Sequence, residues 1–502
     1  MRHTVKTQLK NMPTMRMYVR TLRFLLAKAV HDLFPAGKVY VDHAVSKGYY
    51  CQLFVNDSDH LATEEDIWAV KQRMQTLIDA NFPIEVYHQP TAKVIDLFRA
   101  NGMKDKALLL ETVNDAYSIY NVLDGYADSF YGALLPSTGE IYLFDLMPYS
   151  DGFLLRVPNP EHPDELQPYV EQAKMRQVFQ KEIAWEIAMG MTNVGDLNMK
   201  NKLGVMPMLV KVAEVLQERA IGHIADEITD RFTHNGVRMV LISGPSSSGK
   251  TTFCKRLQIQ LYAKTLRPIM LSLDDYFVNR TQTPLDENGD YDYETIHAID
   301  LEQFNADLQQ ILAGEKVALP TYNFQKGERE YLGNTIQMHS DSILVMEGIH
   351  AMNPLLMPSL PEHIRYKVYV SALTSIALDA HNCIPTTDNR LVRRIVRDHQ
   401  FRGVSAAETL ARWASVRKGE EKWIFPFQEN ADQMFNSAML YELAALRPII
   451  EPLLKMVLPD DPQFAGAQRL LNFLHYFNPI HKKELPNTSL LREFVGGSSF
   501  EY

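Results

Sequence analysis

The sequence predicts a parallel α/β sheet with helices on both faces in its second half, preceded by an α+β domain. From Gly236 onward, short apolar runs alternate with helical patterns, as in a parallel sheet that is covered on both faces. Residues 17–157 combine strand-like alternation with a long helical segment, which is typical of an α+β domain. The 502 residues are enough for two or three domains.

The composition is that of an ordinary globular protein, with 46% hydrophobic and 22% charged residues. A net charge of -10 argues against a general nucleic-acid-coating role, although a local basic groove remains compatible with it. The three cysteines, Cys51, Cys254 and Cys383, are far apart, which disfavours disulfides and cysteine zinc sites and favours a reducing cytoplasm. No signal peptide and no membrane-spanning run of roughly 20 apolar residues is found. We therefore expect a cytoplasmic protein without membrane contact.

In chain order, the elements follow from periodicity. The runs KVYVDHAV and YYCQLFV predict strands, and EEDIWAVKQRMQTLIDANF predicts a helix. Residues 157–168, VPNPEHPDELQP, are rich in proline and acids and predict a linker. Helices follow, including PMLVKVAEVLQERAIGHIADEITDRF, and lead to the strand VRMVLIS, a helix from Lys250, and the strands IMLSL, DSILVMEG and YKVYVS.

A glycine-rich loop joins the strand VRMVLIS to the next helix. Residues 244–251 read GPSSSGKT and match the pattern G-x-x-x-x-G-K-[ST] in full. In this pattern, backbone N–H groups surround phosphate oxygens at the positive end of a helix. Lys250 would reach the β- and γ-phosphates, and the Thr251 hydroxyl would hold Mg²⁺. The predicted nucleotide site contains Gly244, Pro245, Ser246, Ser247, Ser248, Gly249, Lys250, Thr251 and Thr252.

Carboxylates follow two of the predicted strands. IMLSLDDYF ends at Asp274 and Asp275, and SILVMEG ends at Glu347. The carboxyl ends of strands face the ligand crevice in an open α/β sheet. A carboxylate such as Asp274 can accept a proton from a substrate hydroxyl or help to hold a metal, and Glu347 suits Mg²⁺. The simpler alternative for each is a turn residue or a surface acid at a strand end.

Four arginines share one face of a predicted helix: Arg390, Arg393, Arg394 and Arg397. Four arginines without a lysine favour forked contacts to phosphate oxygens. Arg402 and Gly403 add a further donor and a flexible point. We interpret this helix as a mobile lid over the phosphates, and the alternative is a solvated basic surface helix.

From Gly236 to about Arg447, the chain resembles the uridine kinase and phosphoribulokinase family of ATP-dependent kinases. The matching blocks, in family order, are GPSSSGKTT, LSLDDYF, DYDYE, LPTYNF, ILVMEGIHAMN and DNRLVRRIVRDHQFRG. The resemblance implies an α/β P-loop kinase fold with ATP and Mg²⁺ as cofactors. It also implies a small-molecule substrate, whose accepting group would be the 5′-hydroxyl of a nucleoside.

The resemblance assigns roles to residues. The implied catalytic residues are Asp274 as base, with Lys250, Arg394 and Arg397, and the implied ATP site extends from the loop to Thr252 and Arg393. The implied metal site is Thr251, Glu347 and Asp274. The implied substrate site is Asp274, Tyr276, Glu294, Tyr322, Phe324 and Arg390. Here Glu294, with Asp292 as the alternative, takes the place of the acid that binds ribose hydroxyls, and the two aromatics match the base pocket.

The segment after the aromatics departs from the family. Uridine and cytidine kinases carry a base-reading histidine there, whereas YNFQKGERE has Gly327 near that position. A site that lacks a hydrogen-bonding group discriminates less well between bases, so the resemblance does not imply specificity for pyrimidines. Two alternatives stay open. One is a kinase of a sugar phosphate or other metabolite. The other is a nucleotide-dependent RNA-binding or regulatory protein, which ranks third because the basic residues of 20–155 are mixed with acids.

Residues 20–157 resemble the second accessory domain of threonyl-tRNA synthetases. The matching blocks are VDHAVSKGYYCQLFV, the helix EEDIWAVKQRMQTLIDANFPIE, and LLPSTGEIYLFDLM. That domain edits mischarged tRNA with a helical histidine pair and later cysteine and histidine residues. Here Arg20 and Phe24 stand at the helical pair, and DSFYGALLPSTG has neither Cys nor His. Because imidazoles and thiols supply that chemistry, we expect a binding module without editing activity.

The expected organisation resembles that of bacterial long-form uridine kinase-like proteins. It comprises an N-terminal segment (1–19), an accessory-like domain (20–157), a helical linker (158–235), a kinase-like domain (236–480) and a tail (481–502). By analogy with the family, a homo-oligomer is expected.

Overall fold

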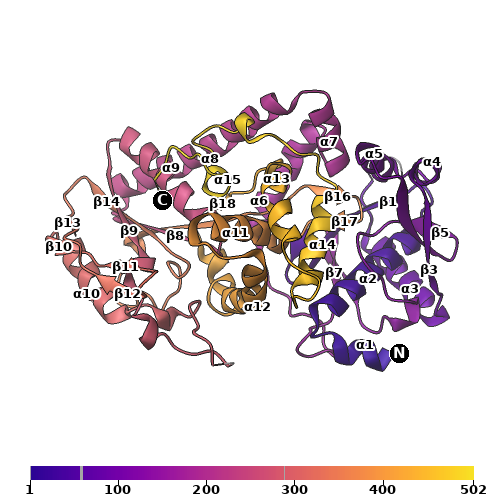
Figure 1. The fold of residues 1–502 in the computed structure, drawn as a ribbon, viewed down its shortest axis with the longest axis horizontal. Coiled ribbons are helices and arrows are strands. Elements are labelled where there is room, and N and C mark those ends of the chain that lie inside the picture. Colours follow the sequence, from indigo (N-terminus) through magenta and orange to yellow (C-terminus); the bar gives the residue numbers. More distant parts are fainter. Residues whose placement is uncertain (1, 57–59, 288, 502) are drawn as a thin grey trace. The chain divides into compact units, whose positions relative to one another are not determined.

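The computed structural model describes residues 2–56, 60–287 and 289–501. The chain divides into two compact units, which Figure 1 shows in sequence colours. The first unit comprises residues 1–206, 374–388 and 468–480, and the second comprises 207–373, 389–467 and 481–502. The predicted linker 158–235 is therefore divided between the units, and two later segments return to the first unit.

The first unit carries separate antiparallel sheets, with the strand orders β1-β2-β7-β6, β3-β4-β5 and β16-β17. Its strands are β1 (Lys38–Val45), β2 (Gly48–Phe54), β3 (Ile84–Pro90), β4 (Tyr117–Leu123), β5 (Tyr126–Asp128), β6 (Asp145–Tyr149), β7 (Gly152–Arg156), β16 (Ala377–Asp379) and β17 (Asn382–Cys383). Its helices are α1 (Arg2–Gln8), α2 (Met12–Leu33), α3 (Glu64–Ala80), α4 (Thr91–Ala100), α5 (Lys104–Thr112), α6 (Ala173–Ala188) and α7 (Val194–Lys202). The α+β prediction is confirmed.

The core of the first unit forms around α2 and α3. Helix α2 is buried along most of its length, and residues such as Leu22, Leu25 and Leu26 are fully buried there. Helix α3 begins at a capping box, in which Thr63 and Asp66 bond reciprocally, and it ends where Asn81 adopts a left-handed conformation. These start and stop signals explain why the segment predicted as a helix forms one.

A returning segment completes a buried ion network in the first unit. Lys106 Nζ lies 2.8 Å from Asp128 Oδ1 and 2.7 Å from Asp379 Oδ1, and all three side chains are almost completely buried. Asp379 belongs to β16, and His381 Nδ1 lies 2.7 Å from Asp128 Oδ2. Because buried charges are tolerated only when paired, residues 374–388 are integral to this unit.

The second unit contains a five-stranded sheet with the order β18-β15-β8-β14-β9, in which every pair is parallel. Its principal strands are β8 (Met239–Ser243), β9 (Arg267–Ser272), β14 (Ser342–Glu347), β15 (Arg365–Ser371) and β18 (Gln433–Asn436). Shorter strands are β10 (Val317–Ala318), β11 (Thr321–Asn323), β12 (Glu328–Glu330) and β13 (Thr335–Ile336).

Helices flank this sheet: α9 (Lys250–Ala263), α10 (Leu301–Leu312), α12 (Ala406–Trp423), α13 (Glu442–Lys455) and α15 (Arg492–Val495). Three further helices have residues in both units: α8 (Met206–His234), α11 (Thr386–Arg402) and α14 (Phe464–Leu474). Strand β8 is buried at every residue and lies between β14 and β15, and α9 packs on the sheet. The predicted α/β architecture is therefore confirmed.

No helix within the described residues is long and apolar enough to cross a membrane.

Candidate functional site

The glycine-rich loop turns directly from the central strand β8 into α9, which begins at Lys250 as predicted. Two close approaches require its glycines. A Cβ on Gly244 would lie 2.0 Å from the carbonyl oxygen of Val370, and a Cβ on Gly249 would lie 2.6 Å from Leu490 Cδ2. Gly249 also has φ 84°, and Ser247 has φ 60°. The loop therefore holds a left-handed backbone that is packed tightly from both sides.

The side chains that follow the loop have defined partners. Lys250 Nζ donates to the carbonyl oxygens of Gly244 and Pro245 at 3.0 and 3.2 Å, so the ammonium group lies over its own loop. Thr251 Oγ1 donates to Glu347 Oε1 at 3.3 Å. Thr252 is buried and its hydroxyl donates to Glu493 Oε2 at 2.7 Å. Lys250 and Thr251 thus face the site, and Thr252 anchors α9 to the C-terminal segment.

Asp274 and Glu347 follow adjacent parallel strands. Glu347 ends β14 and is in register with Ser272 of β9, so Asp274 lies just beyond the same edge. Burial raises the pKa of Glu347 to about 7, against the opposing charge of Lys250, and the Asp274 charge raises it further. Burial also raises the pKa of Asp274, opposed by Lys250, Arg402 and Arg397. The sheet thus brings both predicted carboxylates into one electrostatic cluster with Lys250.

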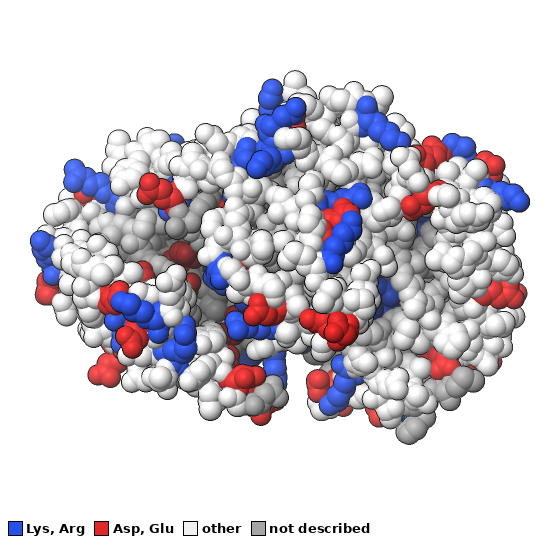
Figure 2. Space-filling model, viewed as in Figure 1, with Lys and Arg blue, Asp and Glu red and all other residues white. Residues whose placement is uncertain are grey.

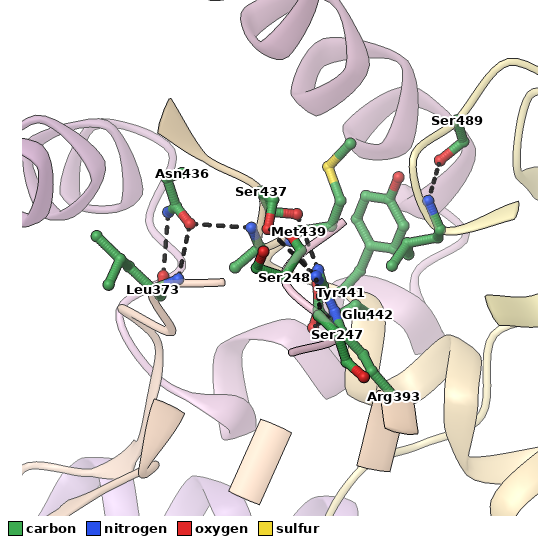
Figure 3. A network of polar contacts seen from close by, with 12 residues as sticks. Ser247, Ser248, Leu373, Arg393, Asn436, Ser437, Met439, Tyr441, Glu442 and Ser489 are labelled. Carbon is green, nitrogen blue, oxygen red and sulfur yellow. Dashed lines mark hydrogen bonds and ion pairs between the residues drawn. The ribbon is translucent and has the colours of Figure 1, made fainter. Parts of the chain in front are cut away.

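Arg393 of α11 hydrogen-bonds to the backbone of the glycine-rich loop (Figure 3). The fully buried guanidinium donates to Glu442 at 2.9 and 2.6 Å and to the Ser437 carbonyl oxygen at 2.8 Å. Its remaining nitrogen donates to the Ser247 carbonyl oxygen at 3.4 Å, and the Ser437 hydroxyl donates to the Ser248 carbonyl oxygen. Arg393 therefore shapes the loop and has little capacity left for a nucleotide.

Arg390 has the same kind of role one turn earlier. It is buried, forms a forked ion pair with Glu420, with 2.7 Å between Nη2 and Oε2, and donates to the Ser246 carbonyl oxygen at 3.1 Å. Glu420 also accepts from the Ser246 backbone N–H at 3.1 Å. Glu420 is a site residue that sequence reasoning missed. Its sequence, RKGEEK, reads as a solvated helix, and only the fold brings it to the loop.

Arg394 and Arg397 lie closer to solvent, with side-chain exposures of 12% and 18%. Arg394 Nη1 donates to the Ser246 hydroxyl at 2.8 Å. Both arginines, together with Arg402, share the carboxylate of Asp398 at 3.2 to 3.3 Å. Three guanidinium groups on one carboxylate leave positive charge beside the loop. The arginines of this helix therefore do not form a solvated basic surface, since Arg390 and Arg393 are buried in ion pairs. A lid movement of the Arg394–Arg402 end stays a prediction.

The two aromatics predicted to line a base pocket, Tyr322 and Phe324, form a cluster with Phe277. The ring centroids of Tyr322 and Phe324 are 5.0 Å apart, and that of Phe277 lies 5.7 Å from Tyr322. Phe324 is 56% exposed, so its ring is available to a ligand. Asp275 accepts from the Tyr322 backbone N–H at 3.2 Å, which gives this carboxylate a structural role.

Tyr276 lies elsewhere, in the hydrophobic core. Its side chain is fully buried against Phe304, and its hydroxyl donates to Asp307 Oδ2 at 3.0 Å. The predicted substrate contact of Tyr276 is therefore not present in this structure, because the short 3₁₀ turn after β9 points this ring inward.

Glu294 lies near the cationic groups of the loop. Burial raises its pKa to about 7, opposed by Arg394 and, more weakly, by Lys250. Its side chain packs against Gly419, where an added Cβ would lie 2.3 Å from the Glu294 Cβ. The structure thus brings Glu294 together with Lys250 and Arg394.

Gly327 stands in a tight turn beside Arg280. It has φ 75°, and a Cβ there would lie 2.8 Å from Arg280 Nε. Arg280 N donates to the Gly327 carbonyl oxygen at 2.8 Å, and its guanidinium donates to the Phe324 carbonyl oxygen at 2.6 Å. A guanidinium therefore occupies the place beside the aromatics, and a side chain at position 327 would collide with it.

The donor set suits a metal that is shared with phosphates. Among the described residues, no group of three or more His, Cys, Asp or Glu side chains is arranged to hold a metal alone. Mg²⁺ usually takes only one or two protein ligands and completes its octahedron with phosphate oxygens and water. The hydrogen-bonded pair of Thr251 and Glu347 matches that requirement.

Known proteins are similar to part of this chain. Residues 239–443 match the family described as "Phosphoribulokinase / Uridine kinase family". A uridine kinase of Schizosaccharomyces pombe is 31% identical over 39% of this chain and 37% of its own length. Uridine kinase-like protein 3 of Arabidopsis thaliana is 25% identical, covering 41% of each chain. A uridine kinase of Ureaplasma parvum is 27% identical over 39% of this chain and 85% of its own. The match to the first two relatives thus spans only about two fifths of their length.

Among solved structures, the chain matches a possible uridine kinase from Bacillus stearothermophilus, with 19% identity and a TM-score of 0.29. That match covers 43% of this chain and 98% of the solved chain. D-glycerate 3-kinase from Cryptococcus neoformans has 15% identity and a TM-score of 0.24, over 56% of this chain and 90% of its own. Because these TM-scores are low, we assign the fold from the order and direction of the strands in the five-stranded sheet.

Proposed function

We propose that this protein transfers the γ-phosphate of ATP to a small-molecule hydroxyl, because residues 239–443 match the family described as "Phosphoribulokinase / Uridine kinase family". The specific acceptor that we propose is the 5′-hydroxyl of a nucleoside. The observation that carries the proposal is the position of Asp274, beyond the strand next to β14 and within the electrostatic reach of Lys250. This arrangement gives a base beside a phosphate-binding loop, as phosphoryl transfer to an alcohol requires.

In the proposed reaction, Asp274 accepts the proton of the attacking hydroxyl. The Lys250 ammonium turns from the loop carbonyls to the transferring phosphate and neutralises its charge. Arg394 and Arg397 supply further positive charge, since together with Arg402 they share a single carboxylate. Arg390 and Arg393 act through the loop, because their own donors are taken by Glu420 and Glu442. Transfer is then mainly a matter of positioning and charge neutralisation.

Mg²⁺ bound with ATP would neutralise charge that develops on the phosphates. Thr251 and Glu347 would hold it, through the hydroxyl and carboxylate that are now hydrogen-bonded to each other. A carboxyl with a pKa near 7 is partly protonated at neutral pH, so binding a cation would release a proton from Glu347.

The acceptor side supports a planar, hydroxyl-rich substrate. The exposed Phe324 offers a ring face for stacking, supported by the buried Tyr322 that packs edge-on against it, and Glu294 offers a carboxylate for paired ribose hydroxyls. Arg280 favours a second candidate, a phosphorylated sugar, because its guanidinium lies beside the same aromatics.

The test is a panel of acceptors incubated with Mg²⁺ and γ-labelled ATP. We expect label in a nucleoside monophosphate, and loss of transfer in Lys250→Ala. Lys455→Ala is the matched control, because Lys455 is 63% exposed on α13 and pairs with the nearby Glu451. Labelled sugar bisphosphates alone would support the second candidate. No labelled product from any alcohol would contradict the kinase proposal.

A further inference from the structure

Four arginines gather in the first unit, outside the site described above. Arg16, Arg20 and Arg23 fall at i, i+4 and i+7 on α2 and therefore share one face of this helix. Arg469 joins them through Asp388, which it contacts with a fork of 2.6 and 2.9 Å. We call Arg16, Arg20, Arg23 and Arg469 the arginine cluster.

Asp388 is the only carboxylate that these four arginines contact within the described residues. It lies 3.9 Å from Arg16, and its two oxygens are engaged by Arg469. Arg20 donates to the Ala133 carbonyl oxygen at 3.3 Å, and Arg23 lies 3.2 Å from the Cys383 sulfur. Four positive charges thus meet one negative charge, which is an unfavourable balance for partly buried groups.

Burial and mutual repulsion act on the cluster together. Burial lowers the pKa of Arg20 to about 10, and the charges of Arg16, Arg23 and Arg469 lower it further. Arg20 is nevertheless cationic at neutral pH. Arg23 is 6% exposed, and its buried Nε has no hydrogen-bond partner. A counter-anion would relieve both the repulsion and the unpaired donor.

The cluster is fixed in place before any ligand binds. A Cβ on Gly132 would lie 2.5 Å from Arg20 Cζ, so this guanidinium rests directly on glycine backbone. The Arg23 guanidinium lies 4.0 Å from the ring centroid of Tyr49. The side chains of Arg16 and Arg469 are 33% and 22% exposed, so solvent reaches both guanidinium-bearing side chains. Donors that are fixed and partly exposed suit a small anionic group.

We propose that the arginine cluster is a second anion site, which binds the phosphate group of a small phosphorylated molecule. Guanidinium forks match the geometry of phosphate oxygens, and several forks around one anion can neutralise its full charge. A small ligand fits better than nucleic acid. Arg16 and Arg469 are only partly exposed, Arg23 is buried, and the chain carries a net charge of -10. On the face that Figure 2 shows, acidic and basic side chains are interspersed and form no continuous basic track.

The test is calorimetric titration of the full chain with inorganic pyrophosphate and with glycerol phosphate, after a non-hydrolysable ATP analogue has saturated the nucleotide loop. We expect one remaining site for these probes, and its persistence in Lys250→Ala would separate it from the proposed kinase site. Arg20→Gln should weaken this site by about tenfold or more, because a charge-assisted fork is lost. Arg16→Gln, whose contact with Asp388 is only 3.9 Å, should weaken it with little effect on folding.

Arg99→Gln is the matched control, because Arg99 is a 57% exposed arginine of the same unit that pairs with Glu111. Its affinity for the probes should be unchanged. The proposal would be overturned by no probe binding in the saturated protein, or by equal binding in Arg20→Gln, Arg16→Gln and wild type. Binding of a single-stranded RNA ten-mer, but of neither small probe, would overturn the small-molecule assignment.

Discussion

Asp274 combines burial with a surplus of nearby positive charge. Burial raises the pKa of its carboxyl, while Lys250, Arg402 and Arg397 favour the ionised form that can accept a proton. A base is most effective when its pKa approaches the working pH without exceeding it. The environment of Asp274 is therefore suited to proton transfer from a hydroxyl.

Asp274→Asn should reduce phosphoryl transfer by at least about 10²-fold, because the amide cannot accept the proton. Binding of ATP should change little, since the loop carbonyls and amides are untouched. Single-turnover transfer and nucleotide affinity are measured separately on the same variant. Asp341→Asn is the control, because Asp341 is an exposed acid of the same unit that pairs with Arg267. Turnover of Asp274→Asn at the wild-type rate would refute the role of the base.

The ligand-free protein should become less stable as pH rises through 7, in part because of Glu347. Its folded pKa of about 7 is raised from the usual value of 4.5, so its protonated form is favoured on folding. The contribution is fully present below pH 4.5 and is lost as pH rises through 7. It is of the order of 1 to 3 kcal/mol. Chemical denaturation from pH 5 to 8 checks this, and Glu347→Gln should flatten the dependence. An equally steep profile in that variant would contradict it.

At the scale of elements, the loop is stabilised by helices that are distant in sequence. Arg393 of α11 connects Glu442, which begins α13, with the carbonyl oxygens of the loop. Figure 3 shows these groups close to Ser247 and Ser248. The loop conformation thus depends on a buried ion pair, and not on its glycines alone.

Glu442→Gln should lower the free energy of unfolding by about 3 to 5 kcal/mol, because the buried Arg393 loses its charged partner. ATP affinity should fall with it as the loop relaxes. Glu451→Gln, on the same helix but with a side chain that is 32% exposed in its pairs with Arg447 and Lys455, should cost less than about 1 kcal/mol. Urea unfolding of both variants gives the comparison, and similar costs for the two would contradict the structural role of Glu442.

Gly249→Ala should disrupt the same element by a different mechanism. Its φ of 84° disfavours any side chain, and the new Cβ would collide with Leu490 at 2.6 Å. We expect a loss of about 1 to 3 kcal/mol together with weaker ATP binding. Gly222→Ala in α8, whose nearest contact is 3.7 Å away, should be neutral or slightly stabilising. Thermal unfolding of both variants, with and without ATP, measures the difference between them. A Gly249→Ala variant as stable as the wild type would contradict the predicted collision with Leu490.

At the scale of the molecule, the first unit is discontinuous in sequence. Residues 374–388 and 468–480 complete it, and Asp379 from the first of these pairs with the buried Lys106. A fragment of residues 1–206 lacks this partner and also Asn382, which donates to the Ser129 carbonyl oxygen at 3.0 Å. The extent of the unit is therefore set by tertiary contacts, even though its largest segment is continuous in sequence.

The fragment 1–206 should consequently fail to fold cooperatively. Unpaired buried charge costs several kcal/mol, which is a large part of the stability of a typical domain. Near-ultraviolet circular dichroism and urea unfolding of the fragment, beside the full chain, measure this. A sharp transition with native-like aromatic signals in the fragment would refute it.

Local patterns in the sequence were sufficient for the architecture. A short, continuous apolar run predicted the strand Met239–Ser243, because a central strand of a parallel sheet is buried on both faces. The helical pattern after it predicted the helix from Lys250. The motif GPSSSGKT predicted a loop between a strand and a helix. Its glycines are required there because the backbone is left-handed and closely packed. The parallel sheet followed from the alternation of these elements.

The division of labour among the arginines was decided only by tertiary structure. Helical spacing places four arginines on one face and does not distinguish them: Arg390, Arg393, Arg394 and Arg397. In the structure, the first two are buried in ion pairs with Glu420 and Glu442, and the last two share Asp398. The same holds for Tyr276, which turns into the core, and for residues 374–388, which return to the first unit. Periodicity records which face of an element is buried. It carries no record of the distant partner, because ion pairs and packing contacts join residues whose sequence separation leaves no local pattern.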